Sequence, residues 1–164
     1  MTIHTIEVVC TGSELLLGDT LNTNLAWLGQ ELASSGTRLV RETCVPDERS
    51  AMGSVLRAAL SRSDAVIVIG GLGPTRDDLT RSVAAEVLGC ELASSEDVAA
   101  GIRSFLKGRG LDVPQAAIVA QSEVLVGGEV LANRNGTAPG FWCVADAGIL
   151  VLLPGPPHEF RAMV

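Results

Sequence analysis

Residues 64–80 read Asp-Ala-Val-Ile-Val-Ile-Gly-Gly-Leu-Gly-Pro-Thr-Arg-Asp-Asp-Leu-Thr, an apolar run followed by a glycine-rich turn and two aspartates. The apolar residues 65–69 predict a buried parallel strand. Because Gly70, Gly71 and Gly73 lack a Cβ atom, the backbone can adopt positive φ there and approach a ligand closely. We predict that a helix begins after this turn. The unpaired N–H groups and the dipole of a helix start favour an anion such as phosphate.

Asp77 and Asp78 stand beside this predicted anion site. Two carboxylates repel an anion unless a divalent cation lies between them, and oxygen ligands suit magnesium or a similar hard cation. The alternative is structural, with Thr75 and the two aspartates capping the helix and Thr75-x-x-Asp78 acting as a capping box. This stretch alone is compatible with both interpretations.

The composition of the chain is that of an ordinary globular domain. Its 164 residues are 47% hydrophobic, and the mean hydropathy of +0.35 is compatible with a sizeable core. A net charge of −7 disfavours a general nucleic-acid surface, which would need a basic stripe. The cysteines are scattered and show neither a CxxC redox pair nor a zinc cluster; they are Cys10, Cys44, Cys90 and Cys143.

No apolar run approaches the ~18 residues that indicate a membrane span, and the N-terminus lacks the order of a signal peptide. We therefore expect a soluble cytoplasmic protein that binds neither a membrane nor nucleic acid.

Strand and helix patterns alternate along the chain and predict an α/β fold. The sheet should be mostly parallel and covered by helices on both faces, giving a three-layer αβα arrangement with a late antiparallel hairpin. We predict strands at 6–10, 37–44, 65–69, 141–144 and 149–153, and helices at 22–35, from 50 onward, after the glycine turn, and from 94 or 95 to 109. Gly127-Gly128 predicts a hairpin turn between strands 123–126 and 129–132.

Three of the predicted loops follow strands directly. They span residues 11–19, 45–48 and 70–78. Because ligands in parallel sheets bind beyond the carboxyl ends of the strands, these loops should converge on one crevice. Residues 1–164 show no repeat or linker and form one predicted domain. Its last helical pattern stops after six or seven residues, which suggests truncation at the C-terminal end.

Five motifs occur in order along nearly the entire chain. They are Gly12-Ser-Glu-Leu-Leu-Leu-Gly, Asn22-Thr-Asn, residues 70–80, Asn133-x-x-Gly-Thr-Ala-Pro-Gly-Phe and Leu153-Pro-Gly-Pro-Pro-His-Glu. Together they resemble the N-terminal domain of CinA, the competence/damage-inducible protein family. That domain is similar to the molybdopterin-binding proteins MoaB and MogA and to the gephyrin G domain. The resemblance implies a MogA/MoaB-like molybdopterin-binding fold and a homo-oligomer.

The resemblance also implies roles for individual residues. Asp47 and Asp78 look like the two aspartates that serve pterin and metal chemistry in the molybdopterin group, with Asp77 as a neighbour in the same loop. These three are the expected ligands of a divalent cation such as magnesium, and Glu14 is the candidate general base. The expected ligand-binding residues are Gly12, Ser13, Asn24, Gly70, Gly71, Gly73, Thr75, Gly136, Thr137, Pro154 and Gly155.

Two functions from different classes follow. CinA-type domains are associated with metal-dependent hydrolysis of ADP-ribose-like pyrophosphates, in which water activated by the cation attacks phosphorus with Asp47, Asp78 and Glu14 as catalytic residues. The alternative is a module that binds molybdopterin or a nucleotide without turnover, or that transfers an adenylyl group to the pterin. Both predict a small phosphorylated ligand, and the fold by itself does not choose between them.

Overall fold

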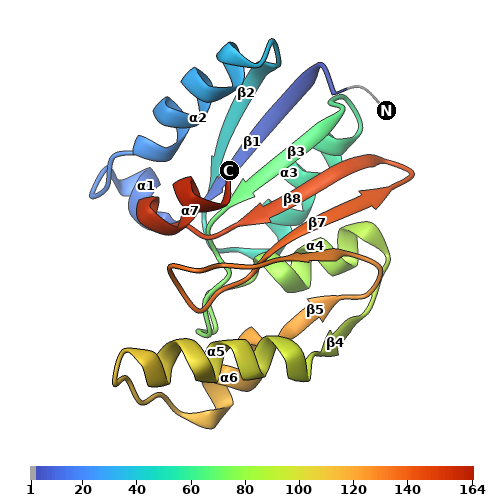
Figure 1. The fold of residues 1–164 in the computed structure, drawn as a ribbon. Helices are drawn as coiled ribbons and strands as arrows, with labels where there is room; N and C mark the ends of the chain where they lie inside the picture. The colour runs from blue at the N-terminus through green and yellow to red at the C-terminus, as the bar shows by residue number, and fades with distance from the viewer. Residues whose placement is uncertain (1–2) are drawn as a thin grey trace.

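The computed structural model describes residues 3–164, which form one large sheet with helices on both faces and a second, two-stranded sheet (Figure 1). The strands are β1 (Thr5–Thr11), β2 (Arg38–Val45), β3 (Ala65–Ile69), β4 (Leu92–Ser94), β5 (Glu123–Leu125), β6 (Glu129–Leu131), β7 (Gly140–Ala145) and β8 (Gly148–Leu153). The helices are α1 (Ser13–Leu17), α2 (Thr23–Ser34), α3 (Arg49–Leu60), α4 (Thr80–Leu88), α5 (Glu96–Gly108), α6 (Gln115–Gln121) and α7 (Pro157–Met163).

The six-stranded sheet has the order β2-β1-β3-β8-β7-β6. Strands β2, β1, β3 and β8 are parallel to one another, whereas β7 pairs antiparallel with both β8 and β6. The predicted α/β class, the mostly parallel sheet and the late antiparallel hairpin are therefore confirmed.

Alternation along each central strand divides the apolar residues between the two faces. On one face, Val66 and Val68 of β3 pack in a core with Met52 and Leu56 of α3. On the other face, Ile67 of β3 packs in a second core, whose members from other elements include Leu28 of α2 and Phe160 of α7. Because helices bury both faces, the two central strands β3 and β8 are apolar throughout rather than alternating.

A smaller unit lies beside this sheet, formed by β4, β5, α5 and α6 (Figure 1). Helices α5 and α6 share a third core of Ala99, Ile102, Leu106 and Ile118. Helix α5 begins as predicted, because the Ser95 side chain accepts a hydrogen bond from the Val98 amide at 3.3 Å.

The hairpin predicted around Gly127-Gly128 is wrong. Strand β5 pairs antiparallel with β4, while β6 pairs with β7, so the chain turns without joining its two flanking strands. Leu125 is 1% exposed and packs in the core below α3 and α4. Burial of this side chain, which a local turn motif cannot specify, directs β5 away from β6.

Two further boundaries differ from prediction. Residues 13–17, expected within a loop, form the short helix α1. Helix α4 begins only at Thr80, two residues after Asp78. Among residues 3–164, no helix is long and apolar enough to cross a lipid bilayer.

Candidate functional site

A cavity of about 550 Å³ lies at the carboxyl ends of β1, β2, β3 and β8. We call it the cleft. It lies beside β1 and β3, where the strand order reverses direction, which is the usual place for a ligand in an open parallel sheet. The predicted site residues that line it are Gly12, Glu14, Asp47, Gly70, Gly71, Gly73, Asp77, Asp78, Thr137, Pro154 and Gly155.

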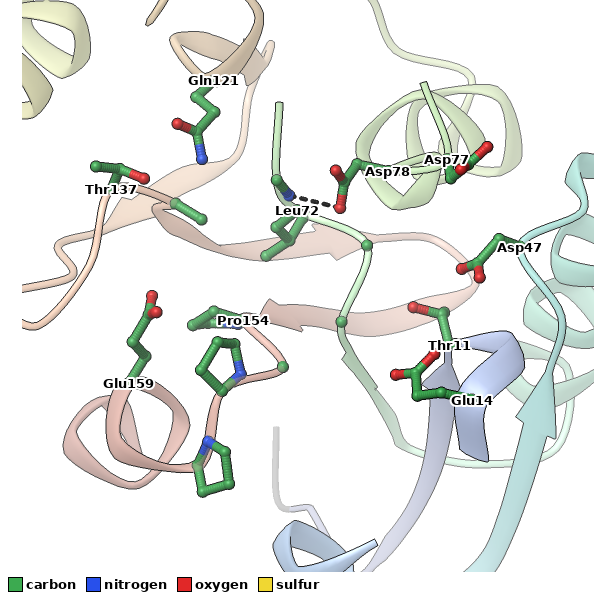
Figure 2. A pocket seen from close by; sticks show the side chains of 18 of the residues that line it. Thr11, Glu14, Asp47, Leu72, Asp77, Asp78, Gln121, Thr137, Pro154 and Glu159 are labelled. Atoms are coloured by element: carbon green, nitrogen blue, oxygen red, sulfur yellow. Dashed lines mark hydrogen bonds between the residues drawn. The ribbon is translucent and has the colours of Figure 1, made fainter. Parts of the chain in front are cut away.

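Four carboxylates gather on one side of the cleft. Figure 2 shows Asp47, Asp77 and Asp78 near Glu14 and Thr11, with Glu159 and Thr137 on the opposite side. These four carboxylates come from the segments that follow β1, β2 and β3, with Glu14 on the short helix α1, so the sheet topology brings them together. Within residues 3–164, the cleft lining includes no lysine or arginine, so its surface is acidic.

The Asp78 carboxylate closes the glycine-rich loop on itself. It accepts hydrogen bonds from the Gly73 amide at 2.8 Å, the Thr75 amide at 2.8 Å and the Thr75 hydroxyl at 2.6 Å (Figure 2 marks the first). Two amides expected to bind phosphate are therefore already satisfied by a side chain of the protein. This contact resembles the predicted capping box, but it stabilises a turn, because α4 begins further along the chain.

The start of α4 is also bound to the loop. The Thr80 amide donates to the Gly71 carbonyl at 3.1 Å, and the Thr80 hydroxyl donates to the Gly70 carbonyl at 2.8 Å. In contrast, within residues 3–164 the amides of Gly71 and Leu72 donate to no protein acceptor. Because Gly71 and Leu72 line the cleft, their amides are donors available to a ligand there.

The loop glycines are required by contacts within the protein itself. Gly70 and Gly71 have positive φ, as predicted, whereas Gly73 does not. A Cβ atom at Gly70 would lie 2.8 Å from the Thr11 carbonyl, and one at Gly73 would lie 2.5 Å from Asp78 Oδ2. Close packing thus accounts for glycine at these positions before any ligand is considered.

The sequence interpretation missed Arg81, which supports the loop from behind. Its guanidinium donates to the carbonyl oxygens of Leu72 at 2.7 Å, Gly73 at 3.1 Å and Ala120 at 3.0 Å. Burial lowers the pKa of Arg81, which is only 5% exposed. Both terminal nitrogens of the guanidinium are thus bound to backbone carbonyls, which fixes the shape of the loop.

Asp47 connects two of the converging loops. Its Oδ2 atom accepts hydrogen bonds from the Ser13 amide at 3.1 Å and the Ser13 hydroxyl at 3.3 Å. The side chains of Glu14 and Asp77, by comparison, form no hydrogen bond with residues 3–164, and both residues are exposed. Asp47 therefore has one oxygen engaged in the protein, whereas Glu14 and Asp77 keep both free.

Four predicted ligand residues do not line the cleft. Ser13 and Thr75 instead hold Asp47 and Asp78. Asn24 donates from Nδ2 to the Gly155 carbonyl at 2.7 Å. This bond positions the segment 154–156 between β8 and α7, which we call the Pro154 loop. Gly136 lies beside the Glu159 carboxylate and faces neighbouring cavities rather than the cleft.

The cleft residues that were not among the predicted site residues include Glu159, Gln121 and Thr11. Glu159 accepts from Asn133 Nδ2 at 2.6 Å, and its side chain is 13% exposed. Gln121 is buried on α6. Thr11 is 6% exposed, and its hydroxyl oxygen has no hydrogen-bond partner within residues 3–164. An unpartnered buried hydroxyl beside a cavity suits a ligand group. Thr11 and Glu159 lie within or next to quoted motifs, but Gln121 carries no local signal.

Comparison with known proteins shows the family. A family model described as "Probable molybdopterin binding domain" matches residues 7–164. A CinA-like protein of Akkermansia muciniphila is 43% identical over 161 residues, which are 97% of this chain and 38% of that protein. The chain spans about 38% of the length of the curated relatives it matches.

Solved structures agree with this assignment. The crystal structure of CinA from Thermoplasma acidophilum matches with a TM-score of 0.87 and 34% identity, covering 98% of this chain and 93% of that one. MoaB from Thermus thermophilus, at 21% identity, shares the fold, with a TM-score of 0.62 over 97% of this chain and 86% of that one. The match to the family model and the 43% identity to a CinA-like protein show that the chain belongs to the molybdopterin-binding domain family, among its CinA-like members.

Proposed function

We propose that the cleft binds a nucleotide or pterin phosphate through a divalent cation, and that it hydrolyses an ADP-ribose-like pyrophosphate. The observation that carries this proposal is the convergence of Glu14, Asp47, Asp77 and Asp78 on one side of a cavity of about 550 Å³. A phosphate entering an acidic cleft is repelled unless a cation accompanies it.

The chemistry of the donor set fits a hard cation. Asp47, Asp77 and Asp78 offer carboxylate oxygens, which magnesium and similar ions prefer to nitrogen or sulfur. Asp77 keeps both oxygens free among the described residues, while Asp47 keeps one. When bound, a divalent cation would neutralise phosphate charge and polarise the phosphorus–oxygen bonds.

The chain's own groups then divide the remaining tasks. The free amides of Gly71 and Leu72 can donate to phosphate oxygens, and the unpartnered Thr11 hydroxyl lies on the same side of the cleft. Glu14, at the start of α1, is the proposed base that accepts a proton from the attacking water. Gln121, Thr137 and the Pro154 loop would contact the part of the ligand that does not react.

An assay of AMP release from ADP-ribose, with and without added magnesium or manganese, tests the proposal. Hydrolysis should require the cation and should fall at least 100-fold in Asp77→Asn. Asp78→Asn should also lose activity, but it disturbs the loop as well. Asp146→Asn is the matched control, because Asp146 is exposed in the β7–β8 turn at the other end of the sheet. Full activity in Asp77→Asn would exclude the proposed cation site.

A second candidate is a binding module without turnover. Its support is that Asp78 and one oxygen of Asp47 are already occupied by Gly73, Thr75 and Ser13. These hydrogen bonds fix the shape of the cleft but leave fewer carboxylate oxygens free to bind a catalytic cation. Calorimetry with molybdopterin and with ADP-ribose separates the two: tight pterin binding without hydrolysis or adenylyl transfer favours the module. Light scattering of the same sample tests the homo-oligomer that the family resemblance implies.

A further inference from the structure

A second cluster of ligand atoms lies beside the cleft, at the boundary between β1, β2 and the start of α2. It consists of Cys10, Glu42 and Cys44, whose ligand atoms all lie within 4.8 Å of one another. We infer that this cluster binds zinc or a similar thiophilic divalent cation, at a site separate from the carboxylates of the cleft.

Sheet register brings these residues together. Cys10 of β1 and Cys44 of β2 are directly paired in the parallel ladder. Glu42 precedes Cys44 by two residues and therefore points to the same face of β2. Because Cys10 and Cys44 are far apart in the sequence, they give no local metal-binding pattern.

The distances suit a shared ion. Three atoms that are all within 4.8 Å of one another leave room for a point no more than about 2.8 Å from each, so small rotamer shifts reach the usual Zn–S distance of ~2.3 Å and Zn–O distance of ~2.0–2.2 Å. Two sulfur ligands select zinc over magnesium, whereas the oxygen-only set of the cleft has the opposite preference. The two sites should therefore distinguish cations by chemical softness.

The surroundings show that these atoms already share a polar donor. Asn22 Nδ2 donates to Cys10 Sγ at 3.1 Å and to Glu42 Oε1 at 2.6 Å. The same side chain caps α2, because its Oδ1 accepts from the Leu25 amide at 3.2 Å. Cys44 Sγ donates a hydrogen bond to Glu42 Oε1 at 3.5 Å. An ion at this position would replace thiol protons as the positive partner of Glu42, with Asn22 as an outer donor.

Solvent can reach the site from two directions. Glu42 is exposed, and Cys10 lines a small cavity of about 110 Å³ that also contacts Thr11 and Glu14 of the cleft. Polar side chains such as Asn22 and Thr23 form part of the cavity lining, and the cavity has room for water, which can complete a four-coordinate ion with three protein ligands. A metal here would fasten β1, β2 and the start of α2 next to the cleft.

Zinc binding to the two cysteines releases their thiol protons. A free cysteine thiol is mostly protonated near neutral pH, whereas zinc is held by the thiolate form. One Zn²⁺ therefore binds with loss of two protons to solvent. Apparent affinity should fall by about 100-fold for each unit that the pH is lowered through this range.

Titration of the untagged, phosphine-reduced chain with Co²⁺ and then Zn²⁺ tests the inference. One equivalent of Co²⁺ should produce a thiolate-to-cobalt charge-transfer band, and Zn²⁺ should displace it. Cys44→Ser should lose this band, whereas Cys90→Ser should keep it; Cys44 and Cys90 are matched free, half-buried thiols. Asp77→Asn should also keep the band, which separates this site from the cleft.

Glu42→Gln provides a variant that does not disturb a buried residue. It should keep the charge-transfer band but bind Zn²⁺ at least 10-fold more weakly in competition with a chelator. No thiolate band in the reduced wild-type chain would overturn the inference. So would equal loss in Cys90→Ser, or a Cys10–Cys44 disulfide in air combined with no metal uptake under reduction.

Discussion

Carboxylates lie at both ends of the parallel strands, but their hydrogen-bond partners differ between the two ends. At the amino ends of β1 and β3, Glu7 is 2% exposed and accepts from Arg62 at 2.6 and 2.7 Å and from Ser63 at 2.8 Å. The hydrogen bonds from Arg62 hold the pKa of Glu7 below its usual range. Backbone amides of His4 and Thr5 likewise lower the pKa of Asp64.

At the carboxyl ends, Asp47 and Asp78 are hydrogen-bonded, but only by neutral amides and hydroxyls. Glu14 and Asp77 form no hydrogen bond with residues 3–164, and no basic side chain of that range lines the cleft. At the amino end, Arg62 therefore neutralises the buried Glu7 carboxylate, and backbone amides bind Asp64. The carboxyl end keeps negative charge facing a cavity, and a cation from solution would be its counterion.

The largest expected effect comes from the backbone of the cleft. Gly71→Ala places a Cβ at positive φ (66°) and against the Thr80 hydroxyl. We expect the free energy of unfolding to fall by about 3 kcal/mol, measured by urea denaturation. Gly101→Ala is the control, because no atom lies within 4 Å of its Cβ in α5; it should be neutral or stabilising. Equal effects would show that the loop is not specifically packed.

Glu7→Gln tests the amino end. Loss of the charge-assisted hydrogen bonds should lower the free energy of unfolding by about 2 kcal/mol, without changing cation-dependent activity. Glu31→Gln, on the exposed face of α2, should change it by less than about 0.5 kcal/mol. Lost catalysis in Glu7→Gln with unchanged stability would contradict the assigned difference between the two ends.

Glu7 should also affect how the free energy of unfolding depends on pH in the acidic range. Because the folded pKa of Glu7 is lowered, its contribution is present above its unfolded pKa of about 4.5 and is lost as pH falls through the folded value. Wild type should therefore lose stability on acidification more steeply than Glu7→Gln. Thermal unfolding between about pH 6 and pH 3 measures this difference, and parallel profiles would count against it.

Asp78→Asn and Asp77→Asn separate two roles within the cleft. The carboxamide introduced by Asp78→Asn has one acceptor oxygen instead of two, so it would accept fewer of the bonds from Gly73 and Thr75 and should cost about 1 kcal/mol. Asp77→Asn should stay within about 0.5 kcal/mol of wild type. Magnesium should raise the Tm of wild type by preferential binding to the native state and should have little effect in Asp77→Asn. A magnesium response retained in Asp77→Asn would exclude that residue as a ligand.

Sequence patterns predicted the central layers well because their signals are local. The β-branched run at 65–69 and the leucine spacing of α2 predict a strand and a helix without reference to distant residues. Strand partners were harder to predict. Pairing of β5 with β4 depends on burial of Leu125. The two glycines at 127–128 indicate a turn but do not indicate whether Leu125 is buried.

Local patterns in the sequence were enough to establish that this chain is an α/β domain and that its polar loops follow strand ends, since side-chain periodicity and glycine chemistry act over a few residues. The contacts of each acid, in contrast, depend on the folded arrangement. Folding directs Asp78 to the amides of its own loop, leaves the Asp77 carboxylate without a hydrogen bond from residues 3–164, and brings Cys10 beside Cys44. Hydrogen bonds and ligand sets form between residues that only sheet register and loop closure bring within about 3–5 Å.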